Sequence, residues 1–328
     1  MSIGSYGAEV IMGFNRGDNN LTNSLEAAVS AKSRLGSQLW GIELGNEPDF
    51  AVAPWNESQE GANQADWFQA LINVWDDSEP ILVGGNYAVP IPLAPNYPNT
   101  NYLIEDAFNS SIKAAVKMYS THSYALSPET ATLNGEMNHV KTVADLYTFV
   151  DKIATARSAG RPYVITEAGF HGLETLQDAT FGAALQIVDK SLRFLSLGAQ
   201  RIYYHQGGLG ANQAAFNWWA ETKVEAPYYG GYFTALALSG GDKIVADDNG
   251  ETSFAQYTIY RNGKPYKAVI VNTEYYSGSG SRDSTTFELT GLSSKTIKAL
   301  RMTAPSSETR IENDQSAGDK PVIGSMYQ

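Results

Sequence analysis

Residues 39–48 read Leu-Trp-Gly-Ile-Glu-Leu-Gly-Asn-Glu-Pro, an apolar run that passes into a polar turn carrying Glu47. Residues 162–169 read Pro-Tyr-Val-Ile-Thr-Glu-Ala-Gly and pass in the same way into Glu167. A carboxylate at the end of a buried strand is costly unless it has a function. The two acids stand about four strand–helix units apart, so we expect them to meet at the mouth of one barrel, in the arrangement that cleaves glycosidic bonds.

The composition excludes several classes of protein. The chain has 328 residues, 43% hydrophobic and 18% charged, which is typical of a globular protein with room for one large and one smaller domain. Its apolar runs are shorter than the roughly 18 residues that a transmembrane helix needs. A net charge of −12 argues against nucleic acid or an anionic membrane as partner. Cysteine is absent, which excludes disulfides, thiol nucleophiles and thiolate metal sites.

Targeting signals are weak in this sequence. Sequons at Asn20, Asn56 and Asn109 permit N-glycosylation in a secreted protein. The first residues, Met1 to Gly4, are neither basic nor apolar, so no signal peptide is expected there.

Short apolar runs alternate with helical patterns as far as residue 206. Strands are predicted at residues 8–14, 39–44, 80–84, 115–119, 163–166 and 200–205, and helices at 23–35, 64–75, 140–159 and 178–197. This alternation predicts βα units and a parallel sheet covered by helices. The strands are two short of the eight in a closed barrel, and the first begins too near Met1 for two more to precede it.

The pattern changes near Tyr232, after which no helical period is seen. Residues 252–260 and 265–272 flank Asn262-Gly263 and predict a β-hairpin with a type I′ turn. Further strands are predicted at residues 285–289 and 296–302. We therefore expect two domains, a barrel over residues 1–231 and an all-β sandwich over residues 232–328.

The sequence Asn46-Glu47-Pro48 has the character of a catalytic acid. Desolvation at a strand end raises a carboxyl pKa, as a general acid requires, and Asn46 can donate to a sugar hydroxyl. Glu167, beside the small residues Ala168 and Gly169, fits an ionised nucleophile. The alternative is structural: Glu47 would cap a helix from a loop, and Glu167 would cap a helix or form an ion pair.

Three segments, residues 41–48, 119–124 and 164–169, resemble strand ends of retaining glycosidases of clan A. More narrowly, the whole chain resembles the fungal, heparanase-related β-glucuronidases of glycoside hydrolase family 79, and residues 303–306 are similar to their β-domain. The resemblance implies a (β/α)8 TIM barrel followed by an all-β domain. It places Glu47 as acid/base on the fourth barrel strand and Glu167 as nucleophile on the seventh. The first two barrel strands are then expected to be missing.

Other site residues follow from their places at strand ends and from this resemblance. Tyr124 is expected to hydrogen-bond the nucleophile, with His122 beside it, and Tyr204 or His205 to bind a substrate carboxylate. The resemblance further implies contacts from His171 and Gly172, in the loop after the nucleophile. For each of these residues, core packing or a structural loop is the alternative.

The expected activity is release of terminal β-linked glucuronic acid, or 4-O-methyl-glucuronic acid, from a glycan by double displacement. Alternatives are another clan A β-glycosidase of xylanase or glucosidase type, or an inactive carbohydrate-binding fragment. No cofactor or metal is expected, because the four histidines lack paired spacing and cysteine is absent. The resemblance also implies a secreted glycoprotein with a glycan as its partner.

Overall fold

The computed structural model describes residues 7–50, 56–127, 130–170, 176–206, 218, 224–282, 284–290, 297–311 and 322–327. The chain forms two compact units and passes between them several times. Unit 1 comprises residues 1–123, 147–168 and 197–203, and unit 2 comprises residues 124–146, 169–196 and 204–328. The sequence boundary between residues 231 and 232 stays a prediction. Within the described ranges, no helix has the length and apolar character needed to span a membrane.

A six-stranded sheet lies in unit 1, except for the last residue of its sixth strand, and it confirms the six predicted strands. Its strands are β1 (Val10–Phe14), β2 (Leu39–Leu44), β3 (Leu82–Tyr87), β4 (Val116–Thr121), β5 (Tyr163–Ala168) and β6 (Arg201–Tyr204). They lie in chain order, and the pairs from β1 to β5 are parallel. Chain order with parallel pairing is the topology of a (β/α)8 barrel, whose functional side chains lie at the carboxyl ends of the strands.

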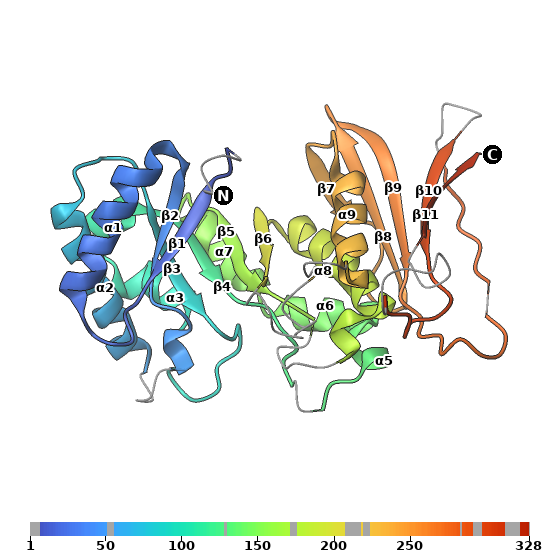
Figure 1. The fold of residues 1–328 in the computed structure, drawn as a ribbon, viewed down its shortest axis with the longest axis horizontal. Coiled ribbons are helices and arrows are strands. Elements are labelled where there is room, and N and C mark those ends of the chain that lie inside the picture. The colour runs from blue at the N-terminus through green and yellow to red at the C-terminus, as the bar shows by residue number, and fades with distance from the viewer. Residues whose placement is uncertain are drawn as a thin grey trace. The chain divides into compact units, whose positions relative to one another are not determined.

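Helices of unit 1 connect these strands. They are α1 (Leu21–Leu35), α2 (Glu57–Val74), α3 (Thr100–Tyr102), α4 (Ser110–Ala115) and α7 (Val150–Ser158). Figure 1 shows α1 and α2 together against one face of the sheet. Asn20, Asn56 and Asn109, the three sequon residues, are N-caps whose side chains accept backbone N–H bonds. The capping box at Asn56 explains why α2 begins seven residues before the predicted position 64.

Side chains from four strands form a small apolar cluster in unit 1. Val83, Met118 and Val164 are buried in it, and Ile11 packs against them. A Cβ on Gly41 would lie 3.1 Å from Val83 and 3.3 Å from Ile11, so a larger residue at this position in β2 would need these side chains to move by a few tenths of an ångström. Because side chains alternate along a strand, Glu43 points to the same face as Gly41, one step nearer the carboxyl end.

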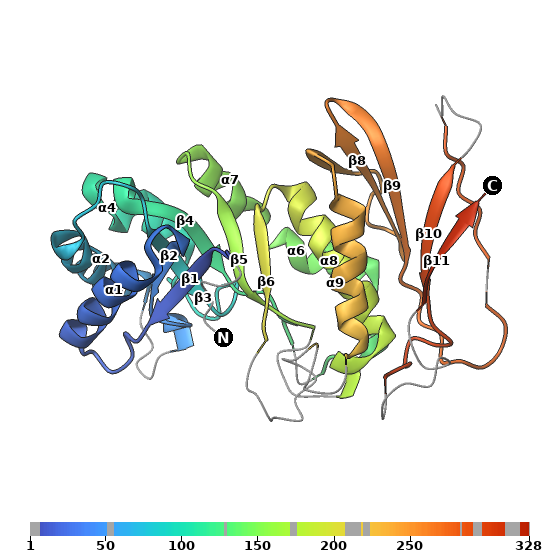
Figure 2. The same ribbon diagram turned by 45° about the horizontal axis from the view of Figure 1, so that its top comes forward.

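The described residues of unit 2 form two antiparallel sheets. One consists of β7 (Lys243–Ala246), β8 (Phe254–Arg261) and β9 (Lys264–Asn272), and the other of β10 (Lys298–Thr303) and β11 (Val322–Tyr327). Positive φ angles of 52° at Asn262 and 73° at Gly263 fit the predicted type I′ hairpin turn. Figure 2 shows α9 (Ala226–Leu238) running beside the sheet of β7, β8 and β9. Helix α8 (Phe181–Leu197) contributes to the same apolar core.

Some predicted elements are wrong in type or extent. The helix expected over residues 140–159 is two helices, α6 (His139–Tyr147) and α7, separated where the chain crosses between the units and buries Phe149. Residues 285–289 form no strand; Phe287 instead packs edge-on against Phe254.

Several elements were not expected, and α9 and β7 are two of them. Helix α9 continues to Leu238, although no helix was predicted there, because it is apolar on all sides and gives no periodic signal. Strand β7 has only four residues, too few for its alternation to be recognised.

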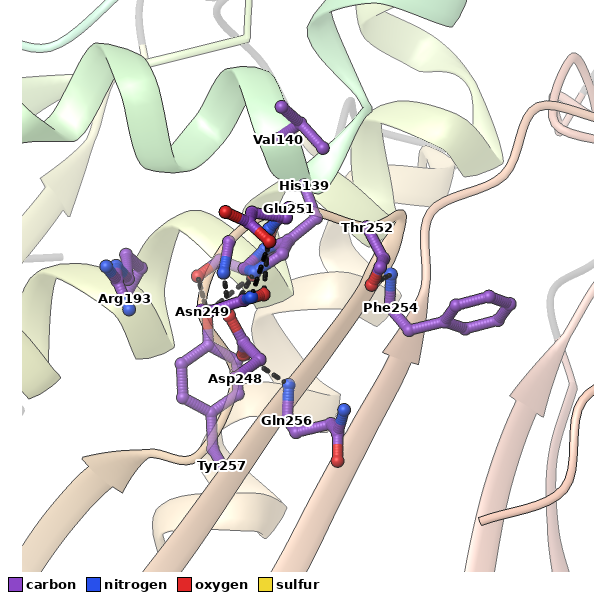
Figure 3. A network of polar contacts seen from close by, with 12 residues as sticks. His139, Val140, Arg193, Asp248, Asn249, Glu251, Thr252, Phe254, Gln256 and Tyr257 are labelled. Atoms are coloured by element: carbon purple, nitrogen blue, oxygen red, sulfur yellow. Dashed lines mark hydrogen bonds and ion pairs between the residues drawn. The ribbon is translucent and has the colours of Figure 1, made fainter.

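A buried ionic cluster ties elements of unit 2 together (Figure 3). His139, the first residue of α6, directs Nδ1 to Asp189 at 2.7 Å and Nε2 to Asp248 at 2.8 Å. The Tyr257 hydroxyl donates to Asp189 at 2.5 Å. Burial opposes a charge on His139, but the bonds to both carboxylates outweigh it and raise its pKa to about 9. We call these four residues the His139 cluster; it links α6, α8, β8 and the turn before β8.

Candidate active site

Three side chains of unit 1 converge at the carboxyl ends of its strands. Glu47 follows β2, His122 follows β4, and Glu167 is the fifth residue of β5. One carboxyl oxygen of each glutamate and one ring nitrogen of His122 all lie within 4.8 Å of one another. A carboxyl separation of about 5–5.5 Å is typical of retaining glycosidases, where one acid attacks the sugar directly. The structure thus brings together the two acids that the sequence singled out.

The backbone at Glu47 adopts an uncommon conformation. Its φ is 46°, and Asn86, whose carbonyl accepts a bond from the Glu47 N–H at 3.1 Å, has a φ of 62°. Left-handed φ values are rare for residues such as glutamate and cluster at functional sites, where the surrounding structure holds them. This conformation turns the chain sharply out of β2 and presents the Glu47 side chain toward His122.

Asn86 determines which ring nitrogen of His122 carries a proton. The Asn86 side-chain amide donates to the carbonyl of Gly45 at 2.9 Å, and its oxygen faces His122 Nε2 at 2.9 Å. The Thr166 hydroxyl donates to the same oxygen at 2.8 Å. An amide oxygen only accepts hydrogen bonds, so Nε2 must carry a hydrogen. Neither Asn86 nor Thr166 was identified from the sequence as a site residue.

Nδ1 of His122 is therefore the nitrogen that forms a hydrogen bond with Glu47. It lies 2.8 Å from the Glu47 carboxyl, and the imidazole is 1% exposed. Either an imidazolium donates to a carboxylate, or a neutral ring accepts from a carboxylic acid. Burial opposes the charged ring, but the bond to Glu47 and the charge of Glu167 outweigh it and raise the pKa of His122. One proton is thus shared between His122 and Glu47, as a group that gives and retakes a proton requires.

Two further carboxyls next to this site were not singled out from the sequence. Burial raises the pKa of Glu43 in β2 to about 7. Burial also raises the pKa of Asp49, to about 6. Asp49 accepts bonds from the backbone N–H groups of Ala88, at 2.9 Å, and Val89, at 3.4 Å. It thereby holds the segment after β3 beside the turn that carries Glu47.

Glu47, His122 and Glu167 also form a donor set that suits a metal ion. The hydrogen bonds around His122 do not favour that use. Nε2 must keep its hydrogen for Asn86, and Nδ1 lies at hydrogen-bond distance from Glu47. A metal on Nδ1 would have to replace the Glu47 bond, whereas a shared proton leaves every contact in place.

The other predicted residues are distributed as follows. Asn46 is exposed beside Glu47. In unit 2, the Tyr124 hydroxyl lies 3.1 Å from His205 Nδ1, so these two predicted residues meet. The Tyr204 hydroxyl contacts Ser191 at 2.8 Å and donates to the Ile187 carbonyl at 3.2 Å, and binding a substrate through it would disturb these bonds. His171 and Gly172 lie outside the described residues, and their contacts stay predictions.

Comparison with known proteins identifies relatives along most of the chain. The sequence pattern described as "Glycosyl hydrolase family 79 C-terminal beta domain" matches residues 256–318. A β-glucuronidase of Aspergillus niger is 28% identical over 81% of this chain and 54% of its own length. A β-glucuronidase of Neurospora crassa is 24% identical over 84% of this chain and 56% of its own length. The chain spans about half the length of these curated relatives.

A solved structure covers nearly all of the chain. It is a 4-O-α-L-rhamnosyl-β-D-glucuronidase from Fusarium oxysporum in complex with Rha-GlcA, 32% identical, with a TM-score of 0.88. The match covers 98% of this chain and 68% of the Fusarium chain. The chain thus shares the fold of that enzyme, which includes a parallel sheet of βα units and separate antiparallel sheets. On this evidence, the chain belongs to glycoside hydrolase family 79.

Proposed function

We propose that the chain is the catalytic part of a retaining β-glucuronidase that releases terminal β-linked glucuronic acid from a glycan. The observation that carries the proposal is the grouping of Glu47, His122 and Glu167 within 4.8 Å. The names of the two curated relatives and the Rha-GlcA complex of the Fusarium enzyme support glucuronic acid as the sugar. Acceptance of 4-O-methyl-glucuronic acid belongs to the same proposal.

In the first step, the Glu167 carboxylate attacks the anomeric carbon while Glu47, as an acid, gives its proton to the leaving oxygen. The bond from carbon to the leaving group breaks, and a glycosyl ester forms on Glu167. The proton that Glu47 gives is the one it shares with His122. Between turnovers Nδ1 can hold this proton and return it to Glu47, so Glu47 is supplied as an acid for the next first step.

In the second step, the Glu47 carboxylate takes a proton from water as the water oxygen attacks the same carbon. The ester bond to Glu167 breaks, the sugar leaves with its original anomeric configuration, and both acids return to their first state. In the proposal, the sugar carboxylate is bound by His171 and Gly172, in the loop after the nucleophile, and by His205 rather than Tyr204, whose hydroxyl keeps its bonds to Ser191 and Ile187. Asn46, exposed beside Glu47, is placed to donate to a sugar hydroxyl.

The test compares aryl β-glucuronides with good and poor leaving groups. Glu167→Gln should lower kcat by at least about a thousandfold on both, because no nucleophile remains. Glu47→Gln should lower it far more on the poor leaving group, since a good one departs without a proton. The exposed Glu26→Gln in α1 serves as control and should match the parent chain. Parental rates in either active-site variant would refute the proposal.

The same assay separates this function from its alternatives. Preference for aryl xylosides or glucosides would indicate another clan A activity. Binding without turnover of any glycoside would indicate a carbohydrate-binding fragment.

We also propose that the protein is a secreted glycoprotein. The three sequon residues, Asn20, Asn56 and Asn109, are exposed at the starts of helices, where an enzyme can reach them. A glycan on the side-chain nitrogen leaves the capping oxygen free. Mass loss on enzymatic deglycosylation of the natively produced protein tests this; an unchanged mass contradicts it.

A further inference from the structure

Glu43 is a partly buried acid that the two catalytic steps do not use. It lies in β2, between Gly13 of β1 and Val83 of β3 in the strand register. A Cβ on Gly13 would lie 3.9 Å from Glu43 Oε2, so the carboxyl extends along the face that Gly13 leaves open. The other oxygen, Oε1, is buried with no hydrogen-bond partner in the described part of the chain. An ionised carboxyl with an unpartnered buried oxygen is costly, which favours the neutral acid.

The hydrogen bonds of Thr166 give a second, independent reason to expect a neutral Glu43. The Thr166 hydroxyl interacts with both Glu43 and the side-chain oxygen of Asn86. It has one hydrogen, and the Asn86 oxygen can only accept, so that hydrogen points to Asn86. Toward Glu43, Thr166 offers only a lone pair. A bond between them therefore needs a hydrogen on Glu43.

We propose that Glu43 is a positioning residue that works as a neutral carboxylic acid and donates to Thr166. Thr166 in turn donates to Asn86, and Asn86 fixes His122 with Nε2 protonated and Nδ1 facing Glu47. The chain of bonds thus runs from the interior of the sheet to the catalytic acid. This inference rests on the proposed function, because Glu47 has its acid role only there.

Ionisation of Glu43 would reverse the direction of these hydrogen bonds. A carboxylate accepts, so the Thr166 hydrogen would turn to Glu43 and leave two oxygens, of Thr166 and Asn86, facing each other at 2.8 Å. Rotation of the Asn86 amide would relieve this repulsion, but it would place an N–H donor opposite His122 Nε2. The hydrogen of the neutral ring would then lie on Nδ1, which would donate to Glu47 instead of accepting from it. Burial raises the pKa of Glu43 to about 7, with the charged groups His122 and Glu167 acting on it; Gly13 and Val83 are uncharged. The hydrogen bonds are therefore expected to change direction near neutral pH.

The kinetic test uses Glu43→Gln, whose amide can donate to Thr166 at every pH. At about pH 6 its kcat/KM should lie within about twofold of the parent, because both side chains are neutral donors there. The ratio of kcat/KM at about pH 8 to kcat/KM at about pH 6 should be about three- to tenfold higher in Glu43→Gln than in the parent. An unchanged ratio would overturn the proposal. Glu136→Gln, at a buried acid of unit 2 whose pKa burial also raises, is the matched control and should keep the parental pH profile.

The relay through Thr166 has its own variants. Thr166→Val should lower kcat about tenfold with KM nearly unchanged, since one hydrogen bond that positions the acid is lost. Thr166→Ser keeps the hydroxyl and should restore parental kcat. In the Thr166→Val background, Glu43→Gln should no longer change the pH ratio, because the pathway is already interrupted. Parental kcat in Thr166→Val would contradict the relay.

A measurement without turnover separates this inference from the proposed function. In the chain labelled with ¹³C at glutamate carboxyls, one resonance should titrate near pH 7 and be absent in Glu43→Gln. If the parent chain cleaves no glycoside, the proposed function fails while this titration still reports on Glu43. If every glutamate titrates below about pH 5.5, the neutral acid is refuted even in an active enzyme.

Discussion

Removing the imidazole of the His139 cluster should change both the stability of unit 2 and its dependence on pH. His139 is fully buried between Asp189 and Asp248 (Figure 3). In the variant His139→Gln, the side-chain amide can donate hydrogen bonds but carries no charge. Both acids are then left buried without a cation beside them, which is among the most damaging changes a core can undergo.

The magnitude follows from the pKa of His139. Its rise from 6.5 to about 9 is a shift of about 2.5 units, or about 3 kcal/mol at about 1.4 kcal/mol per unit. A raised histidine pKa gives stability that is complete below pH 6.5 and is lost as pH rises through about 9. Buried Lys190, whose pKa is lowered to about 8, works in the opposite direction over part of this range. The informative quantity is therefore the difference between parent and variant.

Urea unfolding followed by circular dichroism, at a series of pH values, measures this difference. At about pH 6.5 the free energy of unfolding of the variant should be about 3–5 kcal/mol lower than that of the parent. This difference should become smaller by about 3 kcal/mol by pH 10. Tyr257→Phe removes the hydroxyl that donates to the carboxylate and the carbonyl of Asp189. It should cost about 1–2 kcal/mol, by the same amount at every pH in this range. A constant gap between parent and His139→Gln would refute the assignment of a buried imidazolium.

Three more predictions concern unit 1. Gly85→Ala should destabilise it by at least about 2 kcal/mol in urea unfolding, because φ is +101° and the new Cβ would lie 2.5 Å from the Ser120 carbonyl; an unchanged midpoint would contradict this. His122→Ala should lower kcat about ten- to hundredfold on an aryl glucuronide with a poor leaving group and much less on a good one, since it acts through Glu47; equal losses would argue against that role. Dialysis against EDTA should leave turnover unchanged, because His122 uses both nitrogens for hydrogen bonds; loss of turnover that zinc restores would refute this.

Local patterns were sufficient for the strands that position the two candidate acids, Glu47 and Glu167. Strand β2 begins and ends at the predicted residues, since an apolar run between polar turns has few alternative conformations. The hairpin of β8 and β9 was expected from Asn262-Gly263 between two strand-like segments, because few residues adopt two consecutive positive φ angles. Helix α9 and strand β7 were missed for the reverse reason: one is apolar on every side and the other is very short.

The support of the site could not be predicted from local patterns. His122 contacts Glu47 across 75 positions and Asn86 across 36, and Thr166 contacts Asn86 across 80. Such contacts depend on the register between strands, which no short segment specifies. Glu43 was read as part of an apolar run, and only the neighbouring strands show that its carboxyl lacks a partner for Oε1. The acids were recognisable by type and place, whereas their hydrogen-bond partners required the fold.

The central claim is that Glu167 forms a covalent bond with the sugar. A 2-deoxy-2-fluoro-β-glucuronosyl fluoride reacts in the first step but turns over slowly in the second, so it traps the ester. Intact mass and peptide mapping of the treated chain should show one 2-fluoroglucuronosyl group on the peptide that carries Glu167, and no addition in Glu167→Gln. An adduct on another residue, or cleavage of aryl glucuronides with no adduct and an inverted anomer, would contradict the account.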